Sequence, residues 1–491
     1  MAVLKKIVVV SNTSFADVEY LVKFDEHQIL DGLNAIEIND VELAKKVAGF
    51  LKFNDHFDLF IMSKDRNVLN QIYKLYPYAR LVYEISHLYD FNKLKNEIFG
   101  LHSYTVLISD GEINQQTVRQ LKRHGIVVFT RVNSTLDIAQ SMLAGVDGVV
   151  GLDINELPDL NADYGFSPFV IAHRGFHNDA QENSIRAGIK AHQMDADFIE
   201  MDIHMTKDNK IVVNHDHTLG RTYEKDFIIK KEKLKELQKI KMTYQGEAVD
   251  ERLPLLKDFD NKLVESNIGF IVESKVDSKH AMKRLSKVIN TINRPVLLMS
   301  FHPFSIIHMK KYMPNLLNGL LIDFNLNKMS LKSIIKTSNK YQMMIHPYYK
   351  HSRSEYCEEL RKRAINVLPW GVSEKDAVVT FLRGFYGVNT NHIDQLAEVI
   401  KFVSTKKEVT YDIGDIFNFE LKSDKLLDVS KEVYVFDDQN TGLQTSKDQI
   451  TGATKPGVAY VYLVTKVKLG STRYKLASDL IKVNVKEKDN D

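Results

Sequence analysis

Several short apolar runs in the middle of the sequence end in residues that could do chemistry. The runs are Val170–Ala172, Phe198–Ile199, Ile211–Val213 and Ile271–Val272. The chemically capable residues beside them are two histidines, three carboxylates, an arginine and a lysine: His173, Arg174, Glu200, Asp202, His215, Glu273 and Lys275. In barrels of parallel strands, active sites lie where the strands end and face the loops.

The spacing of the carboxylates predicts that they meet. Strand periodicity of two puts Glu200, Asp202 and His204 on one face of a strand. Glu273 lies on another strand, on the same face as Lys275. Carboxylates that converge among apolar neighbours are costly unless a cation lies between them. A hard divalent ion would meet that need.

The segment Thr206–Lys210 is typical of a turn. Two runs flank it, one ending at His204 and one beginning at Ile211. We expect a hairpin here, and it would return His215 towards the carboxylates.

These residue types fit the cleavage of a phosphodiester. The charge on the phosphoryl oxygens must be stabilised, which a metal ion, Arg174 and Lys275 can do. The nucleophile needs a base and the leaving alkoxide an acid, and His173 and His215 suit both roles near neutral pH. Each residue alone is commonplace at a strand end, so the inference rests on the whole set in this order.

The elements that must position this set alternate along the chain from Lys5 to about Phe402. Short apolar runs are separated by segments with apolar residues three and four apart, such as Asp40–Leu51, Gln115–Arg123 and Lys279–Asn290. This alternation predicts βα units around a parallel sheet, closed as a barrel. The region is longer than the ~250 residues of one TIM barrel, so something more than one barrel is expected.

An internal repeat explains the extra length. Ala35–Ile85 resembles Phe270–Ile322 in order and spacing, and a serine precedes a proline by 14 residues in both (Ser63 to Pro77, Ser300 to Pro314). The first copy lacks the block that holds Glu200, Asp202 and His215. The sequence therefore predicts a first barrel that is incomplete and inactive, with the alternative that all βα units look alike.

After Phe402 the runs become short and alternating, such as Val433–Phe436, Ala459–Val464 and Ile481–Val485. They predict an all-β module, expected to be an immunoglobulin-like sandwich. The predicted domains are thus 1–159, an incomplete phosphodiesterase-like barrel; 160–403, the catalytic barrel; and 404–491, the β-sandwich.

Composition narrows the classes of partner. Of 491 residues 44% are hydrophobic and 26% charged, and the formal net charge is +2, so no electrostatic case exists for nucleic acid or an anionic membrane surface. No apolar stretch is long enough for a membrane span. The apolar run Ile7–Val10 is too short for a signal-peptide core, which favours the cytoplasm, although a β module beside a phosphodiesterase also suits a cell-surface or virion-associated protein.

The chemically capable residues resemble those of the glycerophosphodiester phosphodiesterase family, which has a TIM-like barrel fold. The resemblance covers about 168–402 and is carried by His173-Arg174-Gly175, Glu182-Asn183-Ser184, Glu200-Met201-Asp202, Thr206-Lys207-Asp208, His215-Asp216, Arg221, Glu273-Ser274-Lys275, Ser300-Phe301 and Trp370. A small insertion after the His-Asp motif is typical of the family, and Leu219–Arg252 fits it.

The resemblance implies roles for these residues. His173 and His215 would act as acid and base, and Glu200, Asp202 and Glu273 would hold one divalent cation, Ca²⁺ or Mg²⁺. Arg174 and Lys275 would bind phosphate, while Trp370 and Phe301 would line the substrate pocket. Departures from the family pattern include Thr390-Asn391 in place of Thr-Asp, and we expect them at the edges of the pocket, away from the catalytic set.

The first copy resembles only the later part of the family. Glu37 stands where Glu273 does, Asn39 replaces Lys275, and Thr130 or Arg131 falls near the place of Trp370.

The expected reaction is hydrolysis of a small or polymeric glycerophosphodiester to glycerol 3-phosphate and an alcohol. The alternatives are a lyase that forms a cyclic phosphate, and a surface or virion-type protein that binds or degrades teichoic-acid-like polymers.

Overall fold

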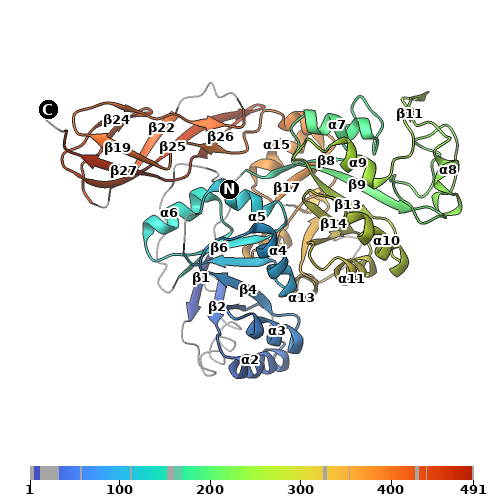
Figure 1. The fold of residues 1–491 in the computed structure, drawn as a ribbon, viewed down its shortest axis with the longest axis horizontal. Helices are drawn as coiled ribbons and strands as arrows, with labels where there is room; N and C mark the ends of the chain where they lie inside the picture. Colours follow the sequence, from blue (N-terminus) through green and yellow to red (C-terminus); the bar gives the residue numbers. More distant parts are fainter. Residues whose placement is uncertain are drawn as a thin grey trace.

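The structure, a computed structural model, describes residues 5–10, 33–55, 58–110, 113–151, 160, 163, 165, 167–323, 329–352, 354–425, 431–437 and 439–488. Three parts follow one another along the chain (Figure 1). Strands β1–β7 with their helices form a first barrel, the strands from β8 to β17 form a second, and β18–β27 form a region rich in β-structure. The segment that joins the two barrels, Leu152–Ser167, lies largely outside the described residues.

Seven parallel strands close on themselves in the first barrel. They are β1 (Lys5–Val10), β2 (Leu33–Glu37), β3 (Phe60–Ser63), β4 (Arg80–Ile85), β5 (Thr105–Ile108), β6 (Val127–Arg131) and β7 (Gly148–Gly151). Each strand pairs on both sides, because β1 bonds to β2 and also to β7. The apolar runs predicted as strands are confirmed here.

The helices of the first barrel begin where the sequence supplies a cap. They are α2 (Val41–Phe53), α3 (Arg66–Leu75), α4 (Phe91–Gly100), α5 (Gln115–Lys122) and α6 (Thr135–Ala144). Each follows a residue whose side chain accepts a hydrogen bond from a backbone N–H of the first turn: Asp40, Asp65, Asp90, Asn114 and Ser134. Such caps satisfy donors that have no partner within the helix.

The second barrel is built on a sheet in the order β16-β15-β14-β13-β9-β8-β17. Its strands are β8 (Phe169–His173), β9 (Phe198–Met205), β13 (Gly269–Ser274), β14 (Val296–Ser300), β15 (Asn318–Ile322), β16 (Met343–Pro347) and β17 (Gly387–Thr390). Residues 366–372 run between β16 and β17: Leu368 N donates to Ile345 O (2.9 Å), and Tyr386 N donates to Val367 O (3.0 Å). This segment completes the TIM-like barrel that was predicted.

Helices and short 3-10 turns connect the strands of the second barrel. They are α7 (Ile185–Gln193), α9 (Leu256–Lys262), α10 (Lys279–Ile289), α11 (Pro303–Tyr312), α13 (Leu331–Tyr341), η2 (Tyr349–His351), α14 (Glu355–Lys362), α15 (Glu374–Leu382) and η3 (Ile393–Leu396).

The two barrels differ by one strand. In the second barrel β9 lies between β8 and β13, while in the first β1 pairs directly with β2. The described part of the first barrel therefore has no counterpart of β9, the strand that carries Glu200 and Asp202. The first barrel still closes, because its seven described strands form a continuous ring.

The insertion after the His-Asp motif forms a small lobe with its own core. It contains η1 (Ile229–Lys231), α8 (Leu234–Leu237), β11 (Thr243–Tyr244) and β12 (Glu247–Ala248). Buried Leu219, Tyr223, Leu237 and Met242 pack together inside it. The lobe lies at the end of the molecule opposite the C-terminal strands (Figure 1).

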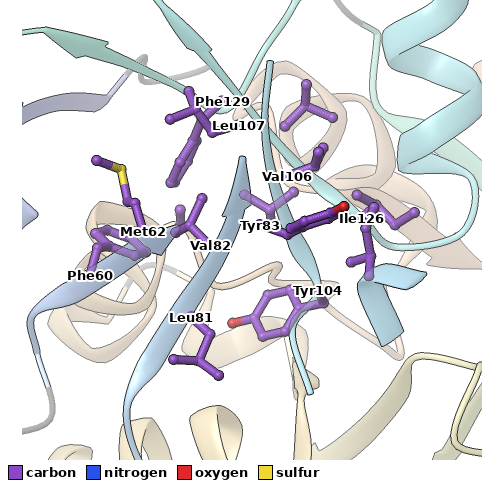
Figure 2. Packing of buried hydrophobic residues seen from close by; sticks show 14 of the residues in the cluster. Phe60, Met62, Leu81, Val82, Tyr83, Tyr104, Val106, Leu107, Ile126 and Phe129 are labelled. Carbon is purple, nitrogen blue, oxygen red and sulfur yellow. The ribbon is translucent and has the colours of Figure 1, made fainter. Parts of the chain in front are cut away.

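A single hydrophobic cluster runs through both barrels. Figure 2 shows its first-barrel side, where Phe60, Leu81, Tyr104 and Ile126 lie at the amino-terminal starts of strands. The second barrel contributes residues from the equivalent end: Phe169, Phe198, Leu317 and Tyr386. The barrels therefore meet at their amino-terminal ends, so the carboxyl ends of the strands, where barrel active sites lie, face away from each other.

Polar side chains add directional contacts across the same interface. Arg119 donates to Ser167 O (3.0 Å), and its Nη2 lies 2.7 Å from Asp197 Oδ1, with both side chains largely buried. Tyr386 Oη donates to Lys122 O (2.6 Å), and Asn366 Nδ2 donates to Gly125 O (2.9 Å). Because these bonds pair buried polar groups, they fix how one barrel is oriented on the other.

The C-terminal part contains two main sheets over a shared core. One holds β19 (Glu408–Asp412), β27 (Ile481–Lys486), β25 (Gly457–Leu469), β22 (Lys431–Phe436) and β26 (Thr472–Ala477); the other holds β20 (Phe417–Asn418), β24 (Gln449–Gly452) and β23 (Gln444–Ser446). β18 (Val403–Ser404) pairs with β21 (Lys422–Ser423). The all-β prediction is confirmed, and the immunoglobulin-like class stays a prediction.

The larger sheet touches the first barrel. Gln115 Nε2 donates to Ala477 O (2.6 Å), Gln115 N donates to Asp479 Oδ1 (2.9 Å), and Leu143 packs on Tyr462. Across the described residues, no helix is both long and apolar enough to cross a membrane.

Candidate active site

The chain reverses sharply where β8 ends. Arg174 and Gly175 both have left-handed backbone conformations, with φ of 58° and 80°. A Cβ on Gly175 would lie 2.7 Å from the carbonyl carbon of Ala187, so only glycine fits there. The turn points the backbone N–H of Arg174 at Glu200 Oε2, 3.1 Å away.

The predicted hairpin between β9 and β10 (Ile211–Val213) is confirmed. Val212 lies opposite His204, and Asn214 N donates to Asp202 O (2.9 Å). His215 follows Asn214 directly. The hairpin therefore brings His215 to the same end of the barrel as the carboxylates. His204 Nε2 lies 3.0 Å from the carbonyl oxygen of His215. Since a carbonyl only accepts, His204 donates, and it supports the His215 backbone.

Lys275 and Arg174 surround Asp202. Lys275 Nζ lies 3.0 Å from Asp202 Oδ1 and is also hydrogen-bonded to Glu273. Arg174 Nε lies 3.2 Å from Asp202 Oδ2, and Asn183 Nδ2 donates to the same oxygen (2.9 Å). Although burial opposes it, the two cations hold the pKa of Asp202 well below its usual range.

The three predicted metal ligands converge. Glu200, Asp202 and Glu273 are buried and offer oxygen atoms that all lie within 4.8 Å of one another. Burial and the neighbouring carboxylates raise the pKa of Glu200 well above its usual value and that of Glu273 to about 7. Glu200 Oε1 is buried without a hydrogen-bond partner among the described residues. A cation would satisfy that oxygen and relieve the repulsion, and an all-oxygen set suits a hard metal ion.

The two candidate histidines present equivalent atoms to the site. His173 Nδ1 lies 2.6 Å from Asn391 Oδ1, and His215 Nδ1 lies 2.8 Å from Asp216 Oδ1. Both partners accept, so each Nδ1 carries a proton and each Nε2 is left for chemistry. Burial, with Arg174 nearby, lowers the pKa of His173 to about 4. His173 Nε2 lies 3.9 Å from Glu200 Oε2, which places it beside the carboxylates.

Aromatic side chains stand at the same end of the barrel. Phe301 and Trp370 contact edge to face with ring centroids 5.3 Å apart, and Tyr348 lies 4.9 Å from Trp370. Lys275 Nζ is 6.0 Å from the Phe301 ring. The predicted pocket residues therefore adjoin the predicted phosphate-binding lysine, with Tyr348 as a neighbour that the sequence did not indicate.

One expectation about the pocket edge is wrong. Asn391 was predicted to lie away from the catalytic set, but its amide oxygen contacts His173 directly. The reason is topological: β17 pairs with β8, so the residue that follows β17 lies beside the residue that ends β8. These residues are 218 positions apart, and no local pattern connects them.

Ion pairs join the polar side chains at the corresponding end of the first barrel. Arg131 Nη2 lies 2.8 Å from Glu84 Oε2 and 3.3 Å from Glu37 Oε2. Asn39, which replaces a lysine, donates to Glu37 (3.1 Å). A guanidinium thus neutralises carboxylates here, and within the described ranges the one group of metal-ligand type is in the second barrel.

Comparisons with known proteins agree with this site. Residues 173–395 match the model of the glycerophosphoryl diester phosphodiesterase family. A glycerophosphodiester phosphodiesterase of Caldanaerobacter subterraneus is 29% identical over 245 residues, covering 47% of this chain and 97% of the relative. One of Bacillus subtilis is 25% identical over 251 residues, covering 47% and 86%.

A solved structure of similar fold is a phosphodiesterase of Oleispira antarctica in complex with the product sn-glycerol-3-phosphate. It is 22% identical, with a TM-score of 0.43, and the match covers 47% of this chain and 95% of that one.

The fold and site of the second barrel define a phosphoric diester hydrolase. The second barrel is the part of the chain that resembles the glycerophosphoryl diester phosphodiesterase family, both by the family model and by these relatives.

Proposed function

We propose that the second barrel hydrolyses glycerophosphodiesters to glycerol 3-phosphate and an alcohol, with a divalent cation and two histidines. The observation that carries this proposal is the convergence of Glu200, Asp202 and Glu273 next to Arg174 and Lys275. Three buried carboxylates and two partly buried cations at one strand-end site suit a phosphate that is bound together with a metal ion.

The cationic and the acidic side chains of the site have different roles. Arg174 and Lys275 bind the nonbridging oxygens of the phosphate, because both are cationic and lie on opposite sides of Asp202. A divalent cation held by Glu200, Asp202 and Glu273 would add positive charge against the phosphoryl group. Asn183 and the backbone N–H of Arg174 keep two of these carboxylates in place.

The histidines supply the proton transfers. One Nε2 takes a proton from the attacking water as the new P–O bond forms, and the other gives a proton to the alkoxide as the old P–O bond breaks. Asp216 and Asn391 hold both rings with Nε2 facing the chemistry. Phe301 and Trp370 line the pocket for the part of the substrate next to the phosphate.

Metal removal tests the proposal. The full chain, treated with excess EDTA, should lose turnover of a glycerophosphodiester such as glycerophosphocholine, and Ca²⁺ or Mg²⁺ should restore it. Phosphorus NMR of the products should show glycerol 3-phosphate. Undiminished turnover in EDTA would reject the metal, a cyclic phosphate would indicate a lyase, and no turnover with any added metal would favour a binding protein.

A further inference from the structure

Arg221 connects two segments of the active site that are distant in sequence. Its Nε lies 2.6 Å from Asp216 Oδ2, and its Nη2 lies 2.6 Å from Glu182 Oε1. Asp216 follows the β9–β10 hairpin, and Glu182 belongs to the turn between β8 and α7. A planar guanidinium can hold two carboxylates at fixed directions, which a lysine cannot do.

Glu182 in turn holds two arginines with one oxygen. Its Oε1 accepts from Arg174 Nη1 (2.9 Å) as well as from Arg221. The Glu182 side chain is only 14% exposed. Although burial opposes it, Arg221 and Arg174 hold the pKa of Glu182 below its usual value, so it is a carboxylate at neutral pH.

The contacts form one continuous chain of alternating charge. It begins at Arg174 beside Asp202, passes through Glu182, Arg221 and Asp216, and ends at His215 Nδ1, 2.8 Å from Asp216. The proposed phosphate-binding arginine and one proposed acid-base residue are thus held to each other through side chains alone.

We propose that Arg221 and Glu182 are positioning residues, which set the His215 ring at a fixed place relative to Arg174. The proposal rests on the proposed function of His215 and Arg174. His215 lies after a hairpin with its side chain 31% exposed, so packing alone does not immobilise it. Arg221 is 48% exposed, and ion pairs with that exposure contribute little to stability. Its effect should therefore fall on geometry, where a misplacement of about 1 Å can cost ~10²-fold in rate.

Three variants separate the two links. In Arg221→Gln, Asp216 loses the arginine that holds it, so kcat should fall about 10- to 100-fold. KM should stay within about threefold, because Glu182 still holds Arg174. In Glu182→Gln both arginines lose the Glu182 carboxylate and keep only their other partners, Asp202 and Asp216, so KM should rise as well. Arg221→Lys should restore part of kcat, because one ammonium can hold one carboxylate. Arg252→Gln is the matched control, since Arg252 is an arginine of the same lobe that pairs with exposed Asp250 (3.3 Å).

A second measurement detects the tautomer of the His215 ring and does not require turnover. In the full chain labelled with ¹⁵N-histidine, His215 should show a protonated Nδ1 in the wild type and a mixture of tautomers in Arg221→Gln, with an unchanged melting temperature. Assignment comes from the spectrum of His215→Ala. Unchanged kcat together with an unchanged His215 signal in Arg221→Gln would overturn the proposal, as would equal losses in Arg252→Gln. An inactive wild type would instead overturn the proposed function, while the His215 signal would still decide the positioning role.

Discussion

At the scale of single residues, the site is a place where like charges are forced together. Glu200 is fully buried, its Oε1 lacks a hydrogen-bond partner among the described residues, and its carboxyl is harder to ionise than an ordinary one. Arg174 pairs with Asp202, and Lys275 pairs with Asp202 and Glu273, so among the described residues neither cation forms an ion pair with Glu200. Such an arrangement costs stability in the absence of a cation, which is typical of a site built to bind one.

The two histidines give a prediction at the same scale. His173→Ala and His215→Ala should each lower kcat by at least ~10²-fold, because each removes a group that transfers a proton. The double variant should be little worse than either single variant, since groups that act as a unit are not additive. Steady-state turnover of a glycerophosphodiester measures this. Near-normal turnover for one single variant would exclude that residue from the mechanism.

At the scale of elements, the turn after β8 decides whether the residues meet. Gly175 allows the left-handed conformation that aims Arg174 N at Glu200, and the hairpin after β9 brings His215 back over the same strand. Both features follow local rules, glycine at positive φ and polar residues in a short turn.

Gly175→Ala tests the importance of this turn. A methyl group would meet the backbone of Ala187 at 2.7 Å, so both melting temperature and kcat should fall strongly. Gly246→Ala is the matched control, because Gly246 also has positive φ (87°) but open space around it, in the turn between β11 and β12. It should cost only about 1 kcal/mol and leave kcat unchanged. Equal effects of the two variants would mean that the β8 turn has no special role.

How much the sequence predicts depends on whether a feature is local. The runs Val170–Ala172 and Ile271–Val272 and the hairpin at Thr206–Lys210 are local, and they were predicted. Contacts between elements that are distant in the sequence were not predicted. Asn391 beside His173 depends on how β17 pairs with β8, and the clamp of Arg221 on Glu182 depends on how the lobe folds back. The closing segment 366–372 forms only isolated bridges to its neighbours, and these too join positions that are distant in sequence, such as Val372 and Thr390.

At the scale of the whole molecule, the two barrels are joined through their amino-terminal ends. The shared core includes Phe60 and Ile126 on one side and Phe169 and Leu317 on the other. The first barrel therefore covers apolar surface that would otherwise face water, and it lies at the pole opposite the proposed chemistry. This arrangement supports a structural role for the first barrel.

Expression of residues 160–491 tests this role. Every proposed catalytic residue is present in that fragment, but Phe169, Phe198 and Leu317 would lose their partners. We expect lower solubility or a lower melting temperature, because exposed apolar patches of this kind promote aggregation. A fragment as soluble, stable and active as the full chain would reject the packing role.

The contact between the first barrel and the C-terminal sheets predicts a pH dependence. Burial raises the pKa of Asp479 to about 6, against the opposing effect of the Gln115 N–H. A raised pKa favours the protonated form in the folded chain, so this contribution to stability is present below pH 3.8 and is lost as the pH rises through 6.

Asp479→Asn keeps the acceptor for Gln115 and removes the charge. It should raise the melting temperature at pH 8, by a stabilisation on the order of 2 kcal/mol, and the difference from wild type should vanish towards pH 4. Thermal unfolding at the two pH values measures this. A variant that is less stable than wild type at pH 8 would show that the ionised carboxylate contributes favourably.

If all chemistry belongs to the second barrel, two glutamates at corresponding strands of the two barrels should respond differently to the same substitution. Glu273 belongs to the buried carboxylate cluster, whereas Glu37, at the corresponding strand of the first barrel, is paired with Arg131. In the full chain with saturating Ca²⁺ or Mg²⁺, Glu273→Gln should lower kcat for a glycerophosphodiester by at least about 10²-fold, and Glu37→Gln should leave it within twofold of wild type. Loss of turnover in Glu37→Gln, or normal turnover in Glu273→Gln, would show that the chemistry is not confined to the second barrel.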